Sequence, residues 1–280
     1  MEEKKNNNLQ YMLEINKQQK NYYEFDTTKE FQHGGNPATR FWDFIRDFQY
    51  QMTDDLNMNE ELFEIHKKWM GDISNKKVLD LGCHTGNELS IYLAQNSKKY
   101  VGIDLSSSAI NVLKNKMESL GINNAHFFSE DILSEQFQEK DFDIIYAKAV
   151  FHHFKYFDEF VEKISRKLNK NGIVITTDPL NTFLPIKIIR ALYRNLQKDK
   201  DWEYPFTKHT FQIIEKYFDF KEVAGMMGKT KWAFPIYLLS KKYSIEKGKK
   251  WIYDDFYNVK LYDKSLWKCL RVSMKLEKKY

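Results

Sequence analysis

Acidic residues and glycines stand close together in Val78–Glu88, a segment that reads VLDLGCHTGNE. Asp80 precedes Gly82 by two positions, and Gly86 follows Gly82 by four. Glycines let the backbone amides of such a turn approach a ligand, because a Cβ atom would hold the ligand off the main chain. An acid inside the turn repels a pyrophosphate but suits a cationic ligand. The Gly-Lys-Ser/Thr and Gly-x-Gly-x-x-Gly patterns of phosphate-binding loops are absent from the segment.

Two more acids and a pair of histidines follow the later apolar segments. Asp104 comes eighteen residues after Gly86, where a carboxylate can accept hydrogen bonds from both hydroxyls of a ribose. Asp131 follows the next apolar segment, and His152 and His153 follow the one after that. Open α/β sheets bind ligands beyond the carboxyl ends of their strands, so we expect these side chains at one edge of a sheet.

The elements that position these residues are five short apolar runs separated by helical patterns. Each run has the length and the β-branched or aromatic content of a buried strand; they are 78–81, 100–103, 125–128, 142–146 and 172–176. Strands that alternate with helices predict a parallel sheet covered on both faces. Further along, the pattern predicts a helix at 184–196, two strands at 220–223 and 235–239, and a basic amphipathic helix at 263–280.

The residues before the first strand predict two or three helices, rich in aromatic side chains from Tyr22 to Met70. We therefore divide the chain into three parts. Residues 1–70 are expected to form a helical, aromatic lid segment, and residues 71–240 the ligand-binding domain, with an insertion at about 179–215. Residues 241–280 are expected to form a basic C-terminal extension.

Composition limits the class of protein. With 280 residues, 42% of them hydrophobic, the chain can bury a core and is not expected to be disordered. It has no run of about 18 apolar residues, and its polar start does not fit a secretory signal. The two cysteines, Cys83 and Cys269, cannot build a disulfide framework, and no Cys/His group has zinc-ligand spacing. We expect a cytoplasmic protein without a metal.

Charge is unevenly distributed along the chain. The formal net charge is +5, but residues 241–280 alone hold 12 basic and 5 acidic residues, which leaves −2 for residues 1–240. A nucleic-acid partner is therefore not expected. A basic helix at the C-terminus would either pack on its own domain or rest on an anionic membrane as a peripheral contact.

Taken in order, several segments resemble the motifs of the class I S-adenosylmethionine-dependent methyltransferases, in particular their small-molecule branch. The segments are 78–86, 101–105, 129–132, 142–154 and 168–177, and the likeness covers roughly residues 76–178. The resemblance implies an α/β fold with a Rossmann-like, seven-stranded, mostly parallel sheet and helices on both faces. The last strand would be antiparallel. It also implies S-adenosyl-L-methionine as the cofactor.

The resemblance implies a set of cofactor-binding residues: Asp80, Gly82, Cys83, Gly86, Asp104, Leu105, Asp131, Ile132 and Ala147. In this arrangement Asp104 would hold the ribose, Asp131 the adenine amino group, and Asp80 would face the methionine amino group. The family usually has a glycine where this chain has His84, and a side chain there would narrow the methionine pocket.

In this family the loop after the fourth strand faces the transferred methyl group, so His152 and His153 are the expected catalytic residues. Ala147–Val150 replaces the Asn/Asp-Pro-Pro-Tyr/Phe motif of many enzymes that methylate amide or base nitrogens. Residues expected to bind the acceptor are Tyr22, Tyr23, Lys148, Phe151 and Arg194.

We therefore expect an S-adenosylmethionine-dependent O-methyltransferase. Its acceptor would be a small hydroxylated or acidic molecule, an anion or a carbohydrate such as a surface-polysaccharide precursor. The alternatives are an RNA or protein methyltransferase, and a methyltransferase-like binding module without catalysis.

Overall fold

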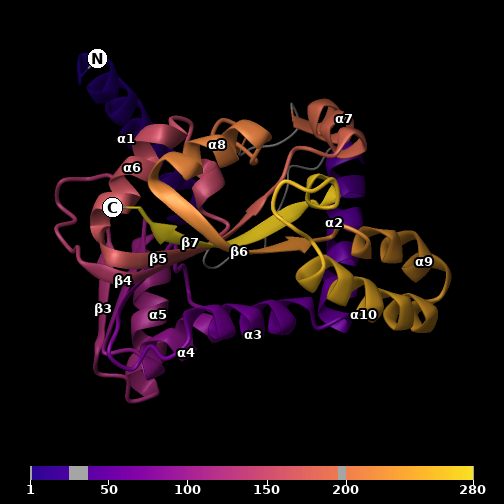
Figure 1. Ribbon diagram of the computed structural model, residues 1–280, viewed down its shortest axis with the longest axis horizontal. Coiled ribbons are helices and arrows are strands. Elements are labelled where there is room, and N and C mark those ends of the chain that lie inside the picture. Colours follow the sequence, from indigo (N-terminus) through magenta and orange to yellow (C-terminus); the bar gives the residue numbers. More distant parts are fainter. Residues whose placement is uncertain (1, 25–36, 195–199, 280) are drawn as a thin grey trace.

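A seven-stranded sheet crosses the molecule in the order β3-β2-β1-β4-β5-β7-β6 (Figure 1). The computed structural model describes residues 2–24, 37–194 and 200–279. The strands are β1 Lys77–Leu81, β2 Lys99–Asp104, β3 Ala125–Ser129, β4 Phe142–Lys148, β5 Leu168–Pro179, β6 Phe218–Met226 and β7 Arg271–Lys278. The five runs predicted as buried strands all lie in β1 to β5, which pair in parallel. β7 is antiparallel to both of its neighbours, as the family resemblance implied.

Helices cover both faces of this sheet. Those that contribute buried side chains to the sheet are α3 Met58–Met70, α4 Glu88–Asn96, α5 Ser107–Ser119, α6 Phe157–Lys167 and α8 Lys208–Tyr217. Helices α3, α4 and α5 pack on one face, and α6 and α8 pack on the other. Along a strand, alternate side chains enter the two cores. In β4, for example, Ile144 joins the first core and Ile145 the second.

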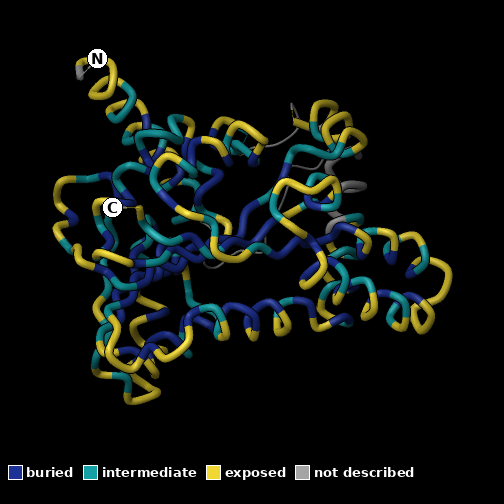
Figure 2. Tube along the Cα trace, viewed as in Figure 1, coloured by how far each residue is buried: buried dark blue, intermediate teal, exposed yellow. Residues whose placement is uncertain are grey.

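Buried residues follow the strands and the inner sides of these helices, while exposed residues lie on the outer helical surfaces (Figure 2). A third buried cluster lies beside β6. It joins α3 to α2 Pro37–Asp55, α9 Ala233–Leu239 and α10 Lys241–Tyr257. This cluster includes Met52, Leu62, Met226, Tyr237 and Ile252. The helices around β6 thus belong to the same packed unit as the sheet.

Three helices precede the first strand, as the sequence predicted: α1 Glu2–Glu24, α2 and α3. Met12 of α1 is buried in the core on the α6 face, so α1 is packed on the sheet domain. Of the aromatic residues in this part of the chain, Phe25 and Phe31 lie outside the described residues, as do the side chains of Phe41 and Trp42.

Two predicted elements of the C-terminal part are wrong. Residues 235–239, expected as a strand, belong to the helix α9. Residues 263–280, expected as a basic amphipathic helix, contain a short 3-10 helix (Leu266–Lys268) and the strand β7. Val272, Met274 and Leu276 join the core on the α6 face, and Ser273 between them is buried on the other side of the strand. The four-residue spacing of Leu266, Leu270 and Met274 fits a helix, although only Met274 of the three lies in β7.

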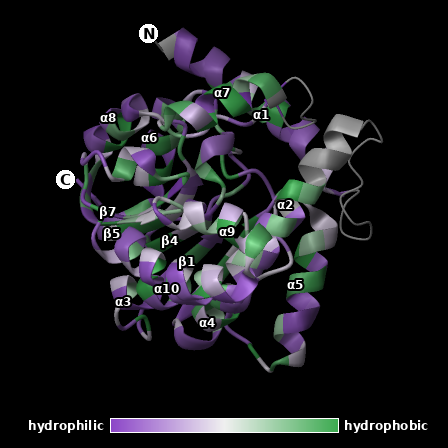
Figure 3. Cartoon of the chain, turned by 90° about the vertical axis from the view of Figure 1, so that its right-hand side faces the viewer, coloured by the Kyte–Doolittle hydropathy of each residue, from purple (hydrophilic) through white to green (hydrophobic). Residues whose placement is uncertain are grey.

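The correction removes the basis of the expected membrane contact, because the terminal segment lies inside the sheet. Within the ranges that the structure describes, no helix combines the length and the apolarity needed to cross a bilayer. The helix predicted at 184–196 is found as α7 Leu184–Tyr193, and residues 195 and 196 lie outside the described ranges. Apolar residues colour much of this helix green (Figure 3), and Leu184, Ile188, Ile189 and Leu192 are exposed.

Candidate functional site

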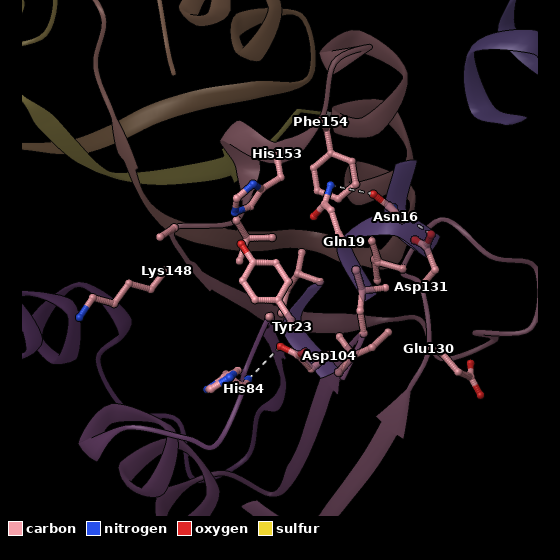
Figure 4. A pocket seen from close by; sticks show the side chains of 17 residues that line it. Asn16, Gln19, Tyr23, His84, Asp104, Glu130, Asp131, Lys148, His153 and Phe154 are labelled. Atoms are coloured by element: carbon pink, nitrogen blue, oxygen red, sulfur yellow. Dashed lines mark hydrogen bonds between the residues drawn. The ribbon is translucent and has the colours of Figure 1, made fainter. Parts of the chain in front are cut away.

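A cavity of about 240 Å³ opens at the carboxyl ends of β1, β2, β3 and β4. It is lined by Asn16, Gln19, Tyr23, Leu81, Gly82, His84, Ile103, Asp104, Leu105, Glu130, Asp131, Ile132, Lys148, Ala149, Val150, His153 and Phe154 (Figure 4). The sequence predicted that polar side chains would meet at this edge of the sheet. Three acids and two histidines line the cavity there: Asp104, Glu130, Asp131, His84 and His153.

The turn after β1 forms one wall of the cavity through its backbone. Gly82 has a φ of 70°, and a Cβ atom built on it would lie 2.4 Å from a Val150 methyl carbon. Its N–H donates to the carbonyl of Ile103 at 2.8 Å, which ties the turn to β2. The turn then leads into α4, whose first amides donate to the side chain of Asn87. Glycine at position 82 therefore meets both a steric and a conformational requirement.

Asp104 lies at the end of β2 and faces the cavity (Figure 4). Its two carboxylate oxygens each accept one backbone hydrogen bond, from His84 and from Ser106, both at 2.9 Å. Each oxygen has capacity for a second donor. Burial raises the pKa of Asp104. The carboxylate is thus fixed in place with acceptor capacity left for two hydroxyls.

His84 stands where a glycine is usual in the family. Its φ of 46° lies in the left-handed region that glycine adopts easily. The residue is exposed and lines the cavity. The chain therefore keeps the backbone shape of the glycine turn while it adds an imidazole at its rim.

Asp131 lines the far side of the cavity, together with Leu105 and Ile132. One of its oxygens accepts from Leu133 N at 2.8 Å and the other from Asn16 Nδ2 at 2.8 Å. Burial raises the pKa of Asp131. Because Asn16 belongs to α1, Asp131 connects α1 to the sheet.

The sequence analysis predicted Tyr22 and Tyr23 of α1 at the acceptor but missed two other residues of this helix. Asn16 and Gln19 are buried polar residues on this helix, and both line the cavity. Near the end of the helix, Glu24 accepts hydrogen bonds from Ser107 N at 2.8 Å and Ser108 N at 3.1 Å, at the start of α5. Asn16 and Gln19 stand in a polar stretch without a motif, so the sequence contains no signal for them.

Asp80, Cys83, Gly86 and Ala147 do not line the cavity. Asp80 is buried beneath the turn, where one oxygen accepts from Tyr100 Oη at 2.8 Å. Burial raises its pKa to about 6, and the nearby charge of Asp104 adds to the increase, although hydrogen bonds from Ser90 and Tyr100 lower it. Asp80 and Asp104 are therefore electrostatic neighbours, but only Asp104 faces the cavity.

The other three residues support the turn from behind. Cys83 and Ala147 are buried, and burial raises the pKa of the Cys83 thiol. Gly86 has a φ of 73°, and a Cβ atom on it would come within 2.3 Å of a Leu113 methyl carbon. A residue that we did not predict, Ala149, lines the cavity two positions after Ala147.

His153, Phe154 and Tyr23 also line the cavity. In Figure 4 the phenol of Tyr23 points toward the imidazole of His153. Burial and the charge of His152 lower the pKa of His153 to about 4. His153 is therefore a neutral imidazole at neutral pH.

His152 turns away from this cavity and is buried. Its Nδ1 lies 2.7 Å from Asp178 and its Nε2 lies 3.3 Å from Glu203. Burial lowers the pKa of His152, but hydrogen bonds to the two carboxylates outweigh burial and raise it to about 9. Sequence reasoning did not single out Asp178 or Glu203.

Lys148 lines the cavity, but its ammonium group extends away from the centre (Figure 4). It donates to Asn59 at 3.2 Å and lies 4.7 Å from the ring centroid of Phe63. Burial, with a contribution from Arg271, lowers its pKa to about 8. The ammonium group of Lys148 is therefore directed toward α3.

The remaining residues expected to bind the acceptor lie outside this cavity. Phe151 is buried against Phe160, with ring centroids 4.8 Å apart. Tyr22 packs edge-on against Trp202 at 5.6 Å. Arg194 donates to two backbone carbonyls and lines a second cavity, which also contains Asn181, Glu203 and Tyr204.

Comparison with known proteins identifies the family. Residues 72–224, more than half of the chain, match a family model described as a methyltransferase domain. Among the relatives is a phosphoethanolamine N-methyltransferase of Plasmodium falciparum, 29% identical over 41% of this chain and 44% of the relative. Another is a tRNA U34 carboxymethyltransferase of Campylobacter jejuni subsp. doylei, 32% identical over 40% of this chain and 38% of the relative. The matches span less than half the length of these curated relatives.

A solved structure shows the same fold. The S-adenosylmethionine-dependent methyltransferase of Methanosarcina mazei superposes with a TM-score of 0.51 at 16% identity, over 76% of this chain and 96% of that chain. At this identity the likeness concerns the fold.

Proposed function

Because the chain belongs to the class I S-adenosylmethionine-dependent methyltransferases, we propose that it transfers the methyl group of S-adenosylmethionine to an oxygen of a small molecule. The cofactor carries a ribose, an adenine and a positively charged sulfonium. The observation that carries the proposal is that Asp104, Asp131 and His153, from three different strand ends, line one cavity.

Asp104 would accept from the ribose hydroxyls and Asp131 from the adenine amino group. Both carboxylates are already held by backbone N–H groups, so they need not reorganise when the cofactor binds. Gly82 would let the cofactor approach the turn, since no Cβ atom stands in the way. Leu105 and Ile132 would supply the apolar surface on either side of the adenine.

The acceptor oxygen would attack the methyl carbon in line with the sulfur. The protein's main tasks are then to align the acceptor and to exclude water. A hydroxyl acceptor must also lose a proton, and a positioned histidine contributes about 10²–10⁴-fold to such a step. His153 lines the cavity and its imidazole is neutral, so it would accept this proton. A carboxylate acceptor would need no base.

The second cavity would hold the body of the acceptor. It adjoins the first at Phe154, which lines both. The buried Asn181 Oδ1, which belongs to the lining residue Asn181, has no hydrogen-bond partner among the described residues. A buried polar atom of this kind favours a hydroxyl-rich acceptor, such as a carbohydrate, over an apolar one.

Methylation of RNA is the alternative that the tRNA-acting relative raises. Residues 1–240, which supply every residue that lines the first cavity, have a formal charge of −2, and this charge does not favour RNA at the cavity. Ala147–Val150 also lacks the motif common among enzymes that methylate base nitrogens.

The proposal is tested by incubating the full chain with S-adenosylmethionine carrying a labelled methyl group and with three acceptor pools. The pools contain sugars and hydroxy acids, small amines including phosphoethanolamine, and bulk tRNA. We expect label only on oxygen atoms in the first pool, and less of it with His153→Asn. Label confined to amines or to tRNA would contradict the proposal, and the absence of cofactor binding would favour a non-catalytic module.

A further inference from the structure

Two histidines and two carboxylates meet between the two cavities. His152 and His153 belong to the 3-10 helix η1 (Phe151–His153), Asp178 lies near the end of β5, and Glu203 lies in the segment before α8. His152 is 5% exposed and Asp178 0%. Among the residues that the structure describes, this is the place where at least three His, Cys, Asp or Glu side chains gather closely enough to hold a metal ion.

Asp178 fixes the orientation of His152. Its Oδ1 accepts from the backbone N–H of His152 at 3.1 Å and lies 2.7 Å from the ring Nδ1. The other oxygen accepts from Thr176 Oγ1. The second ring nitrogen, Nε2, is thereby directed toward Glu203. A carboxylate behind a histidine, with the other nitrogen left for an ion, is the usual outer shell of a metal site.

Two separations in the cluster suit metal ligands. His152 Nε2 lies 3.3 Å from one oxygen of Glu203, and His153 Nδ1 lies 3.6 Å from the other. Two ligands bound at about 2.1 Å to a tetrahedral ion are about 3.4 Å apart. The three ligand atoms all lie within 4.8 Å of one another. The carbonyl oxygen of Trp202, 3.0 Å from His153 Nδ1, is a further potential ligand.

We propose that His152 Nε2, His153 Nδ1 and Glu203 bind a divalent transition-metal ion, with Asp178 as the residue that positions His152. Two imidazoles and one carboxylate are the donor set of several zinc and iron(II) sites. Three protein ligands leave a coordination position for a water molecule or a substrate. The positive charge of the ion would balance the negative charges of Asp178 and Glu203.

The place of the cluster gives such an ion a role, and this role rests on the proposed function. His153 lines the cofactor cavity and Glu203 lines the second cavity, so the open position would face the acceptor. A hydroxyl bound there would lose its proton to solvent more readily. His153, whose Nε2 keeps its proton while Nδ1 binds the ion, would then not act as the base. The oxygen of the hydroxyl would then form the bond to the methyl carbon, while the electron pair of the breaking sulfur–carbon bond stays on sulfur.

Metal binding is measured on the full, chelator-treated chain without an affinity tag and without acceptor. Zn²⁺ is titrated calorimetrically, and Co²⁺ serves as the optical probe of coordination geometry. We expect one ion per chain. Glu203→Gln should weaken binding at least tenfold, and Asp178→Asn about 10- to 100-fold, as for other outer-shell substitutions. His126→Asn is the matched control, because His126 is an exposed histidine on β3.

Three results would overturn the inference: no stoichiometric ion in the wild-type chain, equal affinity in Glu203→Gln and His126→Asn, or Co²⁺ spectra unchanged by either cluster substitution. Binding of S-adenosylmethionine, measured on each variant, reports whether it is folded. If Glu203→Gln does not fold, His153→Gln takes its place. If the chain binds the cofactor but no metal, the proposed function stands and this inference fails. If the chain binds metal but no cofactor, this inference stands and the proposed function fails.

Discussion

Asp104 presents two oxygen atoms to the cavity, and each already accepts one backbone hydrogen bond. In Asp104→Asn one acceptor becomes a donor, so the pair of ribose hydroxyls loses a partner. Hydrogen bonds to charged groups are worth about 1.5–3 kcal/mol, and 1.4 kcal/mol is a factor of ten. We expect the Kd for S-adenosylmethionine to rise at least tenfold in calorimetry. Asp141→Asn, at an exposed position, should leave it unchanged.

Asp80 is a residue whose charge destabilises the fold. Its pKa in the folded chain is about 6, raised by burial from the ordinary value of 3.8. Below pH 3.8 the acid is protonated in both states, and above pH 6 it is ionised in both. The folded state therefore bears the cost of the charge above pH 6, to a limit of about 3 kcal/mol.

We expect Asp80→Asn to unfold at higher urea concentration than the wild type at pH 7 to 8, and the difference to shrink as the pH falls from 6 to 4. Cofactor affinity should fall in the same variant, because a negative charge near the sulfonium is lost. A stability difference that stays constant over this pH range would contradict the assignment of the charge to Asp80.

At the scale of elements, two polar connections hold α1 against the sheet domain: Asn16 to Asp131, and Glu24 to the first amides of α5. A carboxylate at a helix N-terminus is favoured by the helix dipole as well as by the hydrogen bonds. We expect Glu24→Gln to speed dissociation of the cofactor several-fold in a surface-based binding assay. Glu14→Gln, on an exposed part of the same helix, is the control; equal rates in the two variants would argue against the lid.

The strands were predictable from sequence where burial on both faces leaves continuous apolar runs, as in Val78–Leu81 and Phe142–Tyr146. The segment from Leu266 to Leu276 was not, because its apolar spacing fits both a helix and a strand. Pairing with β5 and β6 decides between the two. Local pattern does not contain that tertiary information.

The same limit applies to the site. Motif spacing and the family resemblance predicted Asp104, Asp131 and His153 at this edge of the sheet, and all three line the cavity. Asp80 lies within β1, and its side chain points under the turn toward Tyr100. Glu203 and Asn16 come from segments with no motif, so only the folded chain brings them to the cavities.

At the scale of the whole molecule, the position of β7 predicts what a shortened chain would do. β7 lies between β5 and β6, and β6 has no other strand neighbour in the described sheet. A chain that ends at Ser240 would expose both strand edges and remove the helix α10 from the third buried cluster. We expect it to lack the cooperative thermal unfolding transition of the full chain, as followed by circular dichroism. A cooperative transition at an unchanged midpoint would contradict this account.

The sheet order also has a consequence for synthesis on the ribosome. β6 emerges before α9 and α10, and only after both does its pairing partner β7 arrive. Until then the growing polypeptide carries an open edge on β5 and an unpaired β6, each able to join a foreign strand. Assembly of this half of the sheet must therefore wait while the cofactor-binding half already has all of its strands. Protection by a chaperone would matter most during that interval.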